Sequence, residues 1–154
     1  MDESPDPRSR LFPPAVYLVA TLLGVGLQCL WPLGLVRPPE DRWIGAVLIA
    51  NWAVLAALAI REFRCAGTTV MPTGEVSAFV TSGPFRFTRN PMYLGLALLQ
   101  AGVAFVLGNA WVLLFVPLSI VVIDRVVIAG EERHLEAKYG APYSAYRNRV
   151  RRWL

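Results

Sequence analysis

The sequence predicts an all-α membrane protein with about four transmembrane helices, and its composition and charge spacing support this fold class. Of the 154 residues, 55% are hydrophobic and only 17% are charged, with a mean hydropathy of +0.46. A soluble domain averages about 25% charged residues. Residues 11–36, 43–60 and 92–123 carry no charge, and about 17–25 apolar residues suffice to cross a bilayer. We therefore predict spans at roughly 15–33, 43–61, 92–107 and 111–129.

The distribution of basic residues predicts that the N- and C-termini are both cytoplasmic, in a protein of the cell membrane. With that orientation, thirteen of the fifteen basic residues are cytoplasmic, and only Arg37 and Arg42 are external. Such an excess of Lys and Arg is typical of cytoplasmic segments. The net charge of +4 therefore does not indicate nucleic-acid binding. We expect the basic tail at 147–152, with Trp153, to lie on anionic lipid headgroups.

The segments between the spans indicate a single domain over residues 1–154. We expect residues 1–10, which are polar and contain prolines, to be disordered, and residues 37–41 to form a short external turn. A Gly-Asn pair at 108–109 joins the last two spans into a tight antiparallel hairpin. The cytoplasmic segment at 62–91 is longer, and loops of that length usually carry function.

Cysteine and histidine usage gives no sign of a disulfide or a metal site. Cys29 lies inside the first predicted span and Cys65 lies on the cytoplasmic side, so we do not expect them to pair. His134 is the single histidine and has no second ligand at a metal-binding spacing. We therefore expect no bound metal.

The fourth span continues beyond its apolar part. Asp124 and Arg125 follow it directly, and the helical pattern then runs on to Glu131 and Glu132. At about 1.5 Å per residue, a continuous helix would project well beyond the hydrocarbon. Asp124 and Arg125 would then lie near the cytoplasmic interface. Charges at that depth either pair or line a cavity, or they snorkel to the headgroups.

Residues 88–93, with the sequence Thr-Arg-Asn-Pro-Met-Tyr, predict a helix start, and we call them the helix-start motif. Asn90 is a favoured N-cap and Pro91 is a favoured first helical residue. The unpaired N–H groups of a helix start attract anions. Arg89 adds a full positive charge there, and Tyr93 adds a hydroxyl group. The alternative is a capped membrane helix with an arginine that snorkels to the headgroups.

A turn precedes the helix-start motif. Residues 81–85 have the sequence Thr-Ser-Gly-Pro-Phe, and a glycine allows the backbone to approach a ligand closely. We include Gly83 and Phe85 among the candidate binding residues for this reason.

Glu131 and Glu132, the glutamate pair, lie on the predicted cytoplasmic side, as the helix-start motif does. Adjacent carboxylates repel each other, so we expect a cation nearby. The internal candidates are Arg89, Arg125 and Arg133, and a ligand ammonium or sulfonium group would also serve. The alternative is a solvated helix exit.

Beyond the glutamate pair, an amphipathic segment is broken at residues 140–142. Its tyrosines either form an interfacial belt or fold back over the site.

Together the two motifs offer an anion site and a cation site about one helix diameter apart. Both open to the cytoplasm and border the lipid. This arrangement suits a zwitterionic or mixed-charge cofactor that serves a lipophilic acceptor.

At these residues the chain resembles the integral-membrane methyltransferases of the isoprenylcysteine carboxyl methyltransferase and phospholipid N-methyltransferase superfamily. The matching stretches are residues 83–95, then the glutamate pair with Leu135, Tyr139-Gly140, Tyr143, Tyr146 and Val150. The resemblance covers about residues 68–154. It implies S-adenosylmethionine as the methyl donor. The cofactor pocket that it implies comprises Gly83, Phe85, Arg89, Asn90, Pro91, Tyr93, Leu94, Gly95, Glu131 and Glu132.

The acceptor is expected to be an isoprenoid, a lipid or another hydrophobic small molecule, methylated at O, N or S. Glu131 would act as the base, and Arg125 would orient an anionic acceptor. Prenylcysteine enzymes usually have His where this chain has Asn90, so the resemblance does not single out a prenylcysteine acceptor. The oligomeric state is left open.

Two other classes of protein fit the pattern less well. Membrane sterol reductases, which use NADPH, have a similar C-terminal pattern but generally need more spans to enclose a sterol. Small four-helix transporters generally carry an acidic residue in the first span, where this chain has only Gln28 as a strongly polar side chain. A non-catalytic scaffold is the remaining alternative.

Overall fold

A computed structural model describes residues 11–35, 40–67 and 79–154. The predictions for residues 1–10 and for most of the turn at 37–41 lie outside these ranges. The described chain forms helices α1 (Pro13–Leu30), α2 (Glu40–Cys65), α3 (Pro91–Leu107), α4 (Ala110–Val122), α5 (Ala129–Tyr139) and α6 (Ala141–Arg149). A short 3₁₀ turn, η2 (Gly83–Arg86), precedes α3, and a π-helical turn, η3 (Ile123–Ile128), joins α4 to α5.

The helices confirm an all-α membrane fold. Three helical stretches are long and apolar enough to cross a membrane: Pro13–Leu30, Arg42–Cys65 and Ala110–Tyr139. The third combines α4, the π turn and α5. The shorter apolar helix α3 has 17 residues, or roughly 25 Å at the rise of an α-helix. The first helix ends at Leu30 rather than near residue 33, because the chain turns there and the Leu33 N–H donates to the Gln28 side chain.

Close backbone contacts at glycine hold the helices together. A Cβ atom on Gly102 would lie 2.7 Å from a side-chain carbon of Ile49 and 2.9 Å from the Gly45 carbonyl oxygen. The packing of α3 on α2 therefore requires a residue without a side chain at this position. Small residues at helix contacts are a common device for close packing in membranes. Gly24 has the same role between α1 and α4, where a Cβ would lie 2.8 Å from Val112.

The predicted hairpin between the last two apolar helices is present. Gly108 adopts the left-handed conformation, with φ at 61°, and ends α3. Asn109 then caps α4, because its side-chain oxygen accepts from the Val112 N–H at 3.1 Å. Its amide nitrogen donates to the Gly24 carbonyl at 3.3 Å. One turn therefore joins three helices.

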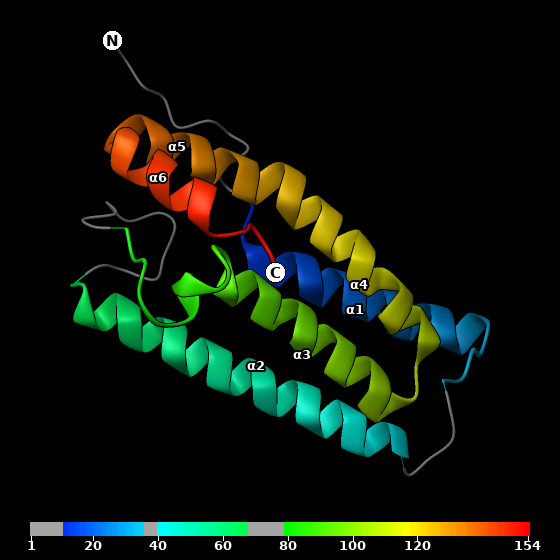
Figure 1. The fold of residues 1–154 in the computed structure, drawn as a ribbon. Helices are drawn as coiled ribbons and strands as arrows, with labels where there is room; N and C mark the ends of the chain where they lie inside the picture. The colour runs from blue at the N-terminus through cyan, green and yellow to red at the C-terminus, as the bar shows by residue number, and fades with distance from the viewer. Residues whose placement is uncertain (1–10, 36–39, 68–78) are drawn as a thin grey trace.

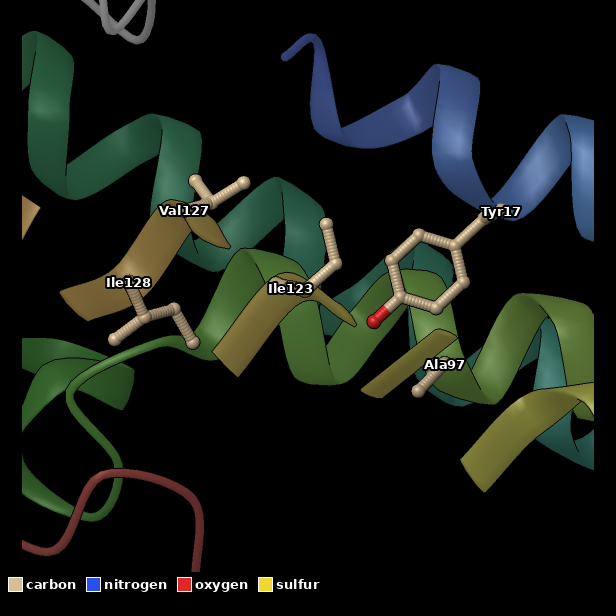
Figure 2. Close-up of a cluster of buried hydrophobic side chains, with 5 residues drawn as sticks. All are labelled: Tyr17, Ala97, Ile123, Val127 and Ile128. Carbon is tan, nitrogen blue, oxygen red and sulfur yellow. The ribbon is translucent and has the colours of Figure 1, made fainter. Parts of the chain in front are cut away.

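A buried apolar cluster lies beneath the polar end of the bundle. It comprises Tyr17, Ala97, Ile123, Val127 and Ile128, from α1, α3 and the π turn (Figure 2). The Tyr17 hydroxyl donates to the Tyr93 carbonyl at 3.2 Å, which ties α1 to the first turn of α3. The cluster thus supports the residues of the candidate site.

Helix α5 continues the line of α4 toward the end of the bundle where α2 ends, and α6 folds back beside α5 (Figure 1). The break predicted at residues 140–142 is present, since α5 ends at Tyr139 and Gly140 has φ at 57°. Tyr143 and Tyr146 are only 2% and 5% exposed and pack together with Phe79. The interfacial-belt interpretation is therefore wrong for these two tyrosines, which fold back toward the site.

Candidate functional site

The fourth apolar helix continues to Tyr139 as predicted, but it contains a π turn that the sequence did not reveal. A π turn absorbs one extra residue within a helix. In an α-helix, residues seven positions apart lie on nearly the same face, because seven residues make about two full turns. Across the π turn, with its one extra residue, the corresponding spacing is eight positions. This register places Asp124 and Glu132 on one face and leaves Glu131 on the neighbouring face. The π turn thus determines that Glu132, and not Glu131, shares a face with Asp124.

Glu131 faces the first turn of α3. Its Oε1 atom accepts a hydrogen bond from the Tyr93 hydroxyl at 2.6 Å. Tyr93 is in turn held in place, because its backbone carbonyl accepts a hydrogen bond from the Tyr17 hydroxyl. The two sequence motifs, separated by 38 residues in the chain, therefore meet in direct contact. A carboxylate held by a fixed hydroxyl donor can accept a proton from a bound molecule without first reorienting.

Glu132 is 8% exposed and binds guanidinium groups instead. Arg89 Nη2 lies 3.0 Å from Glu132 Oε1, and both side chains are 11% exposed. This pair confirms that Arg89 is a cation near the glutamate pair. The other two Arg89 nitrogens, Nε and Nη1, are buried and have no hydrogen-bond partner among the residues that the structure describes. Buried donors of this kind are costly unless a partner occupies them.

The helix-start motif begins α3 at Pro91 as predicted, but Asn90 does not act as a side-chain cap. Asn90 occupies the N-cap position without a capping hydrogen bond. Its side-chain amide donates to the Arg152 carbonyl at 2.9 Å instead. Thr88 supports the turn, because its hydroxyl accepts from the Asn90 N–H at 3.2 Å. The amide is diverted because the C-terminal tail lies against the helix start.

The C-terminal tail is the part of the site that the sequence interpretation missed. The Arg152 guanidinium binds Glu132 at 2.5 Å and Asp124 at 3.1 Å, and Trp153 Nε1 donates to Asp124 at 2.9 Å. We had expected this tail to lie on lipid headgroups. The structure instead brings Arg152 and Trp153 onto protein groups. The signal that could have revealed them is Asp124, a carboxylate at a depth where a charged group needs a partner.

Charge and burial set the protonation of the groups outside the membrane spans. The hydrogen bond from Arg152 to Glu132 raises the pKa of the guanidinium, so Arg152 is always charged. Burial raises the pKa of Tyr146 to about 12, against a smaller opposing effect of Arg89. Tyr146 is therefore neutral and donates to the Phe85 carbonyl at 2.7 Å.

The remaining predicted residues lie around this centre rather than in it. Gly83 has φ at 56° and packs against Glu62 of α2, and Phe85 is buried against Phe63. Pro91 is fully buried at the start of α3. Leu94 is partly buried on the first turn of α3, and a Cβ on Gly95 would lie 3.1 Å from the Trp52 ring of α2.

Arg125 points outward. Its side chain is 82% exposed, and its Nε atom lies 3.8 Å from Asp124. The structure therefore does not bring Arg125 to the Tyr93–Glu131 contact. Arg133, the other cation considered for the glutamate pair, is also exposed.

Comparison with known proteins identifies the family. A model of the phospholipid methyltransferase family matches residues 41–142, about two thirds of the chain. The chain belongs to the phospholipid methyltransferase family. It is thus a membrane methyltransferase of the lipid-acting type within the superfamily that the helix-start motif and the glutamate pair resemble. This membership favours a methyltransferase over the reductase, transporter and scaffold alternatives.

The family match extends further toward the N-terminus than the resemblance did, because it includes α2, and it ends before the C-terminal tail. An uncharacterized protein of Haemophilus influenzae is 44% identical over 63 residues, which cover 41% of this chain and all of that protein. No solved structure matches the chain.

Proposed function

We propose that this chain is an S-adenosylmethionine-dependent methyltransferase of the cell membrane, with both termini cytoplasmic, that methylates a lipophilic acceptor at O, N or S. Family membership supplies the general activity. The cofactor, the acceptor class and the residue roles rest on the chemistry of the site.

The observation that carries the proposal is the donor set of Arg89. This guanidinium gives one nitrogen to Glu132 and holds two further buried nitrogens, Nε and Nη1, that have no hydrogen-bond partner in the described part of the chain. Guanidinium N–H groups form strong charge-assisted hydrogen bonds with carboxylates, so these buried donors suit the carboxylate of S-adenosylmethionine. Glu131 and Glu132 offer acceptors for its amino group or ribose hydroxyls. The residues present therefore fit this cofactor.

Glu131 is the proposed base. When bound, S-adenosylmethionine supplies an electrophilic methyl group for in-line displacement. The Tyr93 hydroxyl fixes the Glu131 carboxylate at 2.6 Å, so that Glu131 Oε2 can accept a proton from the acceptor. Positioning and exclusion of water supply the remaining catalysis, and the tail and the buried α6 face provide that enclosure.

An apolar groove supports a lipophilic acceptor. It has a volume of about 350 Å³ and lies between α1 and α4, lined by residues that include Leu11, Val16, Ser119 and Val122. Val16 also packs on the cluster that contains Tyr17, whose hydroxyl holds Tyr93. The groove therefore adjoins the residues that support the site. Arg125, exposed on the π turn, is the proposed contact for an anionic acceptor.

Mass spectrometry tests this proposal. Purified protein is incubated with membrane lipid extract and S-adenosylmethionine carrying an isotope-labelled methyl group. We expect a labelled methyl group in one lipophilic product with wild-type protein, and none with Glu131→Gln or Arg89→Ala. A labelled product of equal amount with both variants would overturn the residue assignment. A wild-type sample that consumes no methyl donor with any lipid fraction would count against the activity itself.

A further inference from the structure

Arg152 contacts both walls of the candidate site at once. Its backbone carbonyl accepts from the Thr88 hydroxyl at 3.1 Å and from the Asn90 amide at 2.9 Å, on the helix-start side. Its guanidinium binds Asp124 and Glu132 on the opposite side, with Nε 3.1 Å from Glu132 Oε1. One residue thus bridges the two motifs through its main chain and its side chain.

The hydrogen bonds from Arg152 also control the geometry of the ion pair between Glu132 and Arg89. Glu132 accepts from two atoms of Arg152 and from a single nitrogen of Arg89. Without Arg152, the carboxylate would be free to turn and form a bidentate pair with Arg89, the geometry that guanidinium and carboxylate groups favour. That pair would occupy a second Arg89 donor. The donors proposed for the cofactor carboxylate are free because Arg152 restrains Glu132.

We propose that Arg152 is a positioning residue for the cofactor site, which fixes the separation of its walls and keeps the Arg89 donors free. This inference rests on the proposed function. The family match ends before this residue, so the assignment comes from the contacts alone.

Binding of S-adenosylhomocysteine to the full chain in detergent, measured by calorimetry, tests the proposal. We expect Arg152→Gln to weaken binding by about tenfold to a hundredfold, since a misplaced binding group can cost about 10²-fold. Arg152→Lys keeps the charge and is expected to recover part of the loss. Arg149→Gln, the same change at an exposed arginine, is the matched control and is expected to bind as wild type does.

Two further readouts separate positioning from a purely structural role. Arg152→Gln is expected to raise KM for S-adenosylmethionine more than it lowers kcat. In a Glu132→Gln background, the Arg152→Gln change is expected to cost much less binding than in wild type, because interacting residues give non-additive effects. Fully additive losses, or wild-type affinity in Arg152→Gln, would overturn the proposal. If Arg152→Gln does not fold, Arg152→Lys with and without Glu132→Gln gives the same comparison.

A third readout needs no ligand, and it distinguishes failure of this proposal from failure of the proposed function. The Arg89 N–H donates to the Arg151 carbonyl at 3.0 Å, so its hydrogen exchange reports whether the tail is docked. We expect faster exchange at Arg89 in Arg152→Gln than in Arg149→Gln. If wild type binds no S-adenosylhomocysteine, the cofactor assignment fails. Unchanged exchange at Arg89 would show that Arg152 does not tie the walls together.

Discussion

The two adjacent glutamates have different environments, and this difference supports the different roles proposed for them. Glu131 accepts from the Tyr93 hydroxyl, whereas Glu132 binds two guanidinium groups. Both oxygens of Glu132 are engaged by guanidinium groups, whereas Glu131 is engaged through Oε1. We therefore propose Glu131 as the base and Glu132 as the residue that links the two walls of the site.

The first prediction, at the scale of single residues, concerns the replacement of Glu131. Glu131→Gln keeps the hydrogen bond from Tyr93 but removes the proton acceptor, so we expect kcat to fall by about 10²–10⁴-fold. Steady-state methyl transfer to the lipid acceptor measures this loss. Glu136→Gln, which alters a surface ion pair with Arg147, is the control and is expected to retain wild-type turnover. Equal activity in Glu131→Gln and Glu136→Gln would contradict the role of Glu131.

Much of the candidate site could be predicted from single residues, but its partners could not. Arg89, Tyr93 and the glutamate pair stand out because they form two motifs, a helix start and a pair of adjacent carboxylates, on the same predicted side of the membrane. Arg152 was hidden among basic tail residues, which usually bind headgroups. Only the return of the tail to Asn90 and Asp124 distinguishes it, and that return depends on tertiary packing.

At the scale of elements, the π turn sets the register of the site. It allows Asp124 and Glu132 to share one face, with Glu131 on the next. The sequence predicted a continuous helix but not this turn, because hydropathy reports which residues are apolar and not how tightly the backbone is wound. Hydropathy predicted all four apolar helices for the same reason, three of them long enough to cross a membrane, while α6 and the tail depended on contacts distant in the chain.

The π turn yields a prediction about helix length. Deletion of Val126 removes the absorbed residue, so the helix becomes regular while Glu131 and Glu132 keep their orientation. We expect the deletion variant to bind S-adenosylhomocysteine. Insertion of an alanine after Ile128 adds a residue and rotates the glutamate pair by about 100°, so binding is expected to be lost. Calorimetry on both variants checks this, and the opposite pattern would contradict the register argument.

The packing of α2 on α3 yields a stability prediction. Gly102→Val places new atoms against Ile49 and the Gly45 carbonyl, and the backbone oxygen cannot move aside. Overpacking of this kind costs about 1–3 kcal/mol, so we expect a lower midpoint of thermal unfolding in detergent. Gly26→Ala in α1, where an added Cβ meets nothing within 4 Å, is expected not to lower the midpoint and to raise it slightly, because alanine favours the helix more than glycine does. A midpoint for Gly102→Val equal to that of Gly26→Ala would contradict the close contact.

At the scale of the whole molecule, the proposed orientation places the site at the cytoplasmic surface. The end of α2, the start of α3 and both C-terminal helices lie at one end of the bundle (Figure 1). A charged, water-soluble cofactor would reach this end from the cytoplasm, while a lipophilic acceptor would reach it from the bilayer.

The two native cysteines test this orientation. Cys65 ends α2 and is exposed. In a Cys29→Ser background, we expect a membrane-impermeant maleimide to label Cys65 in inside-out vesicles and not in right-side-out vesicles. Labelling in right-side-out vesicles alone would contradict the proposed topology.

The central claim is that the two motifs form one site for S-adenosylmethionine, and direct binding tests it most simply. Calorimetric titration of the folded protein in detergent with S-adenosylhomocysteine is expected to give saturable one-to-one binding. Arg89→Ala is expected to abolish it by removing the free guanidinium donors, and NADPH is expected not to bind. Binding of NADPH, with no saturable binding of S-adenosylhomocysteine, would contradict the account.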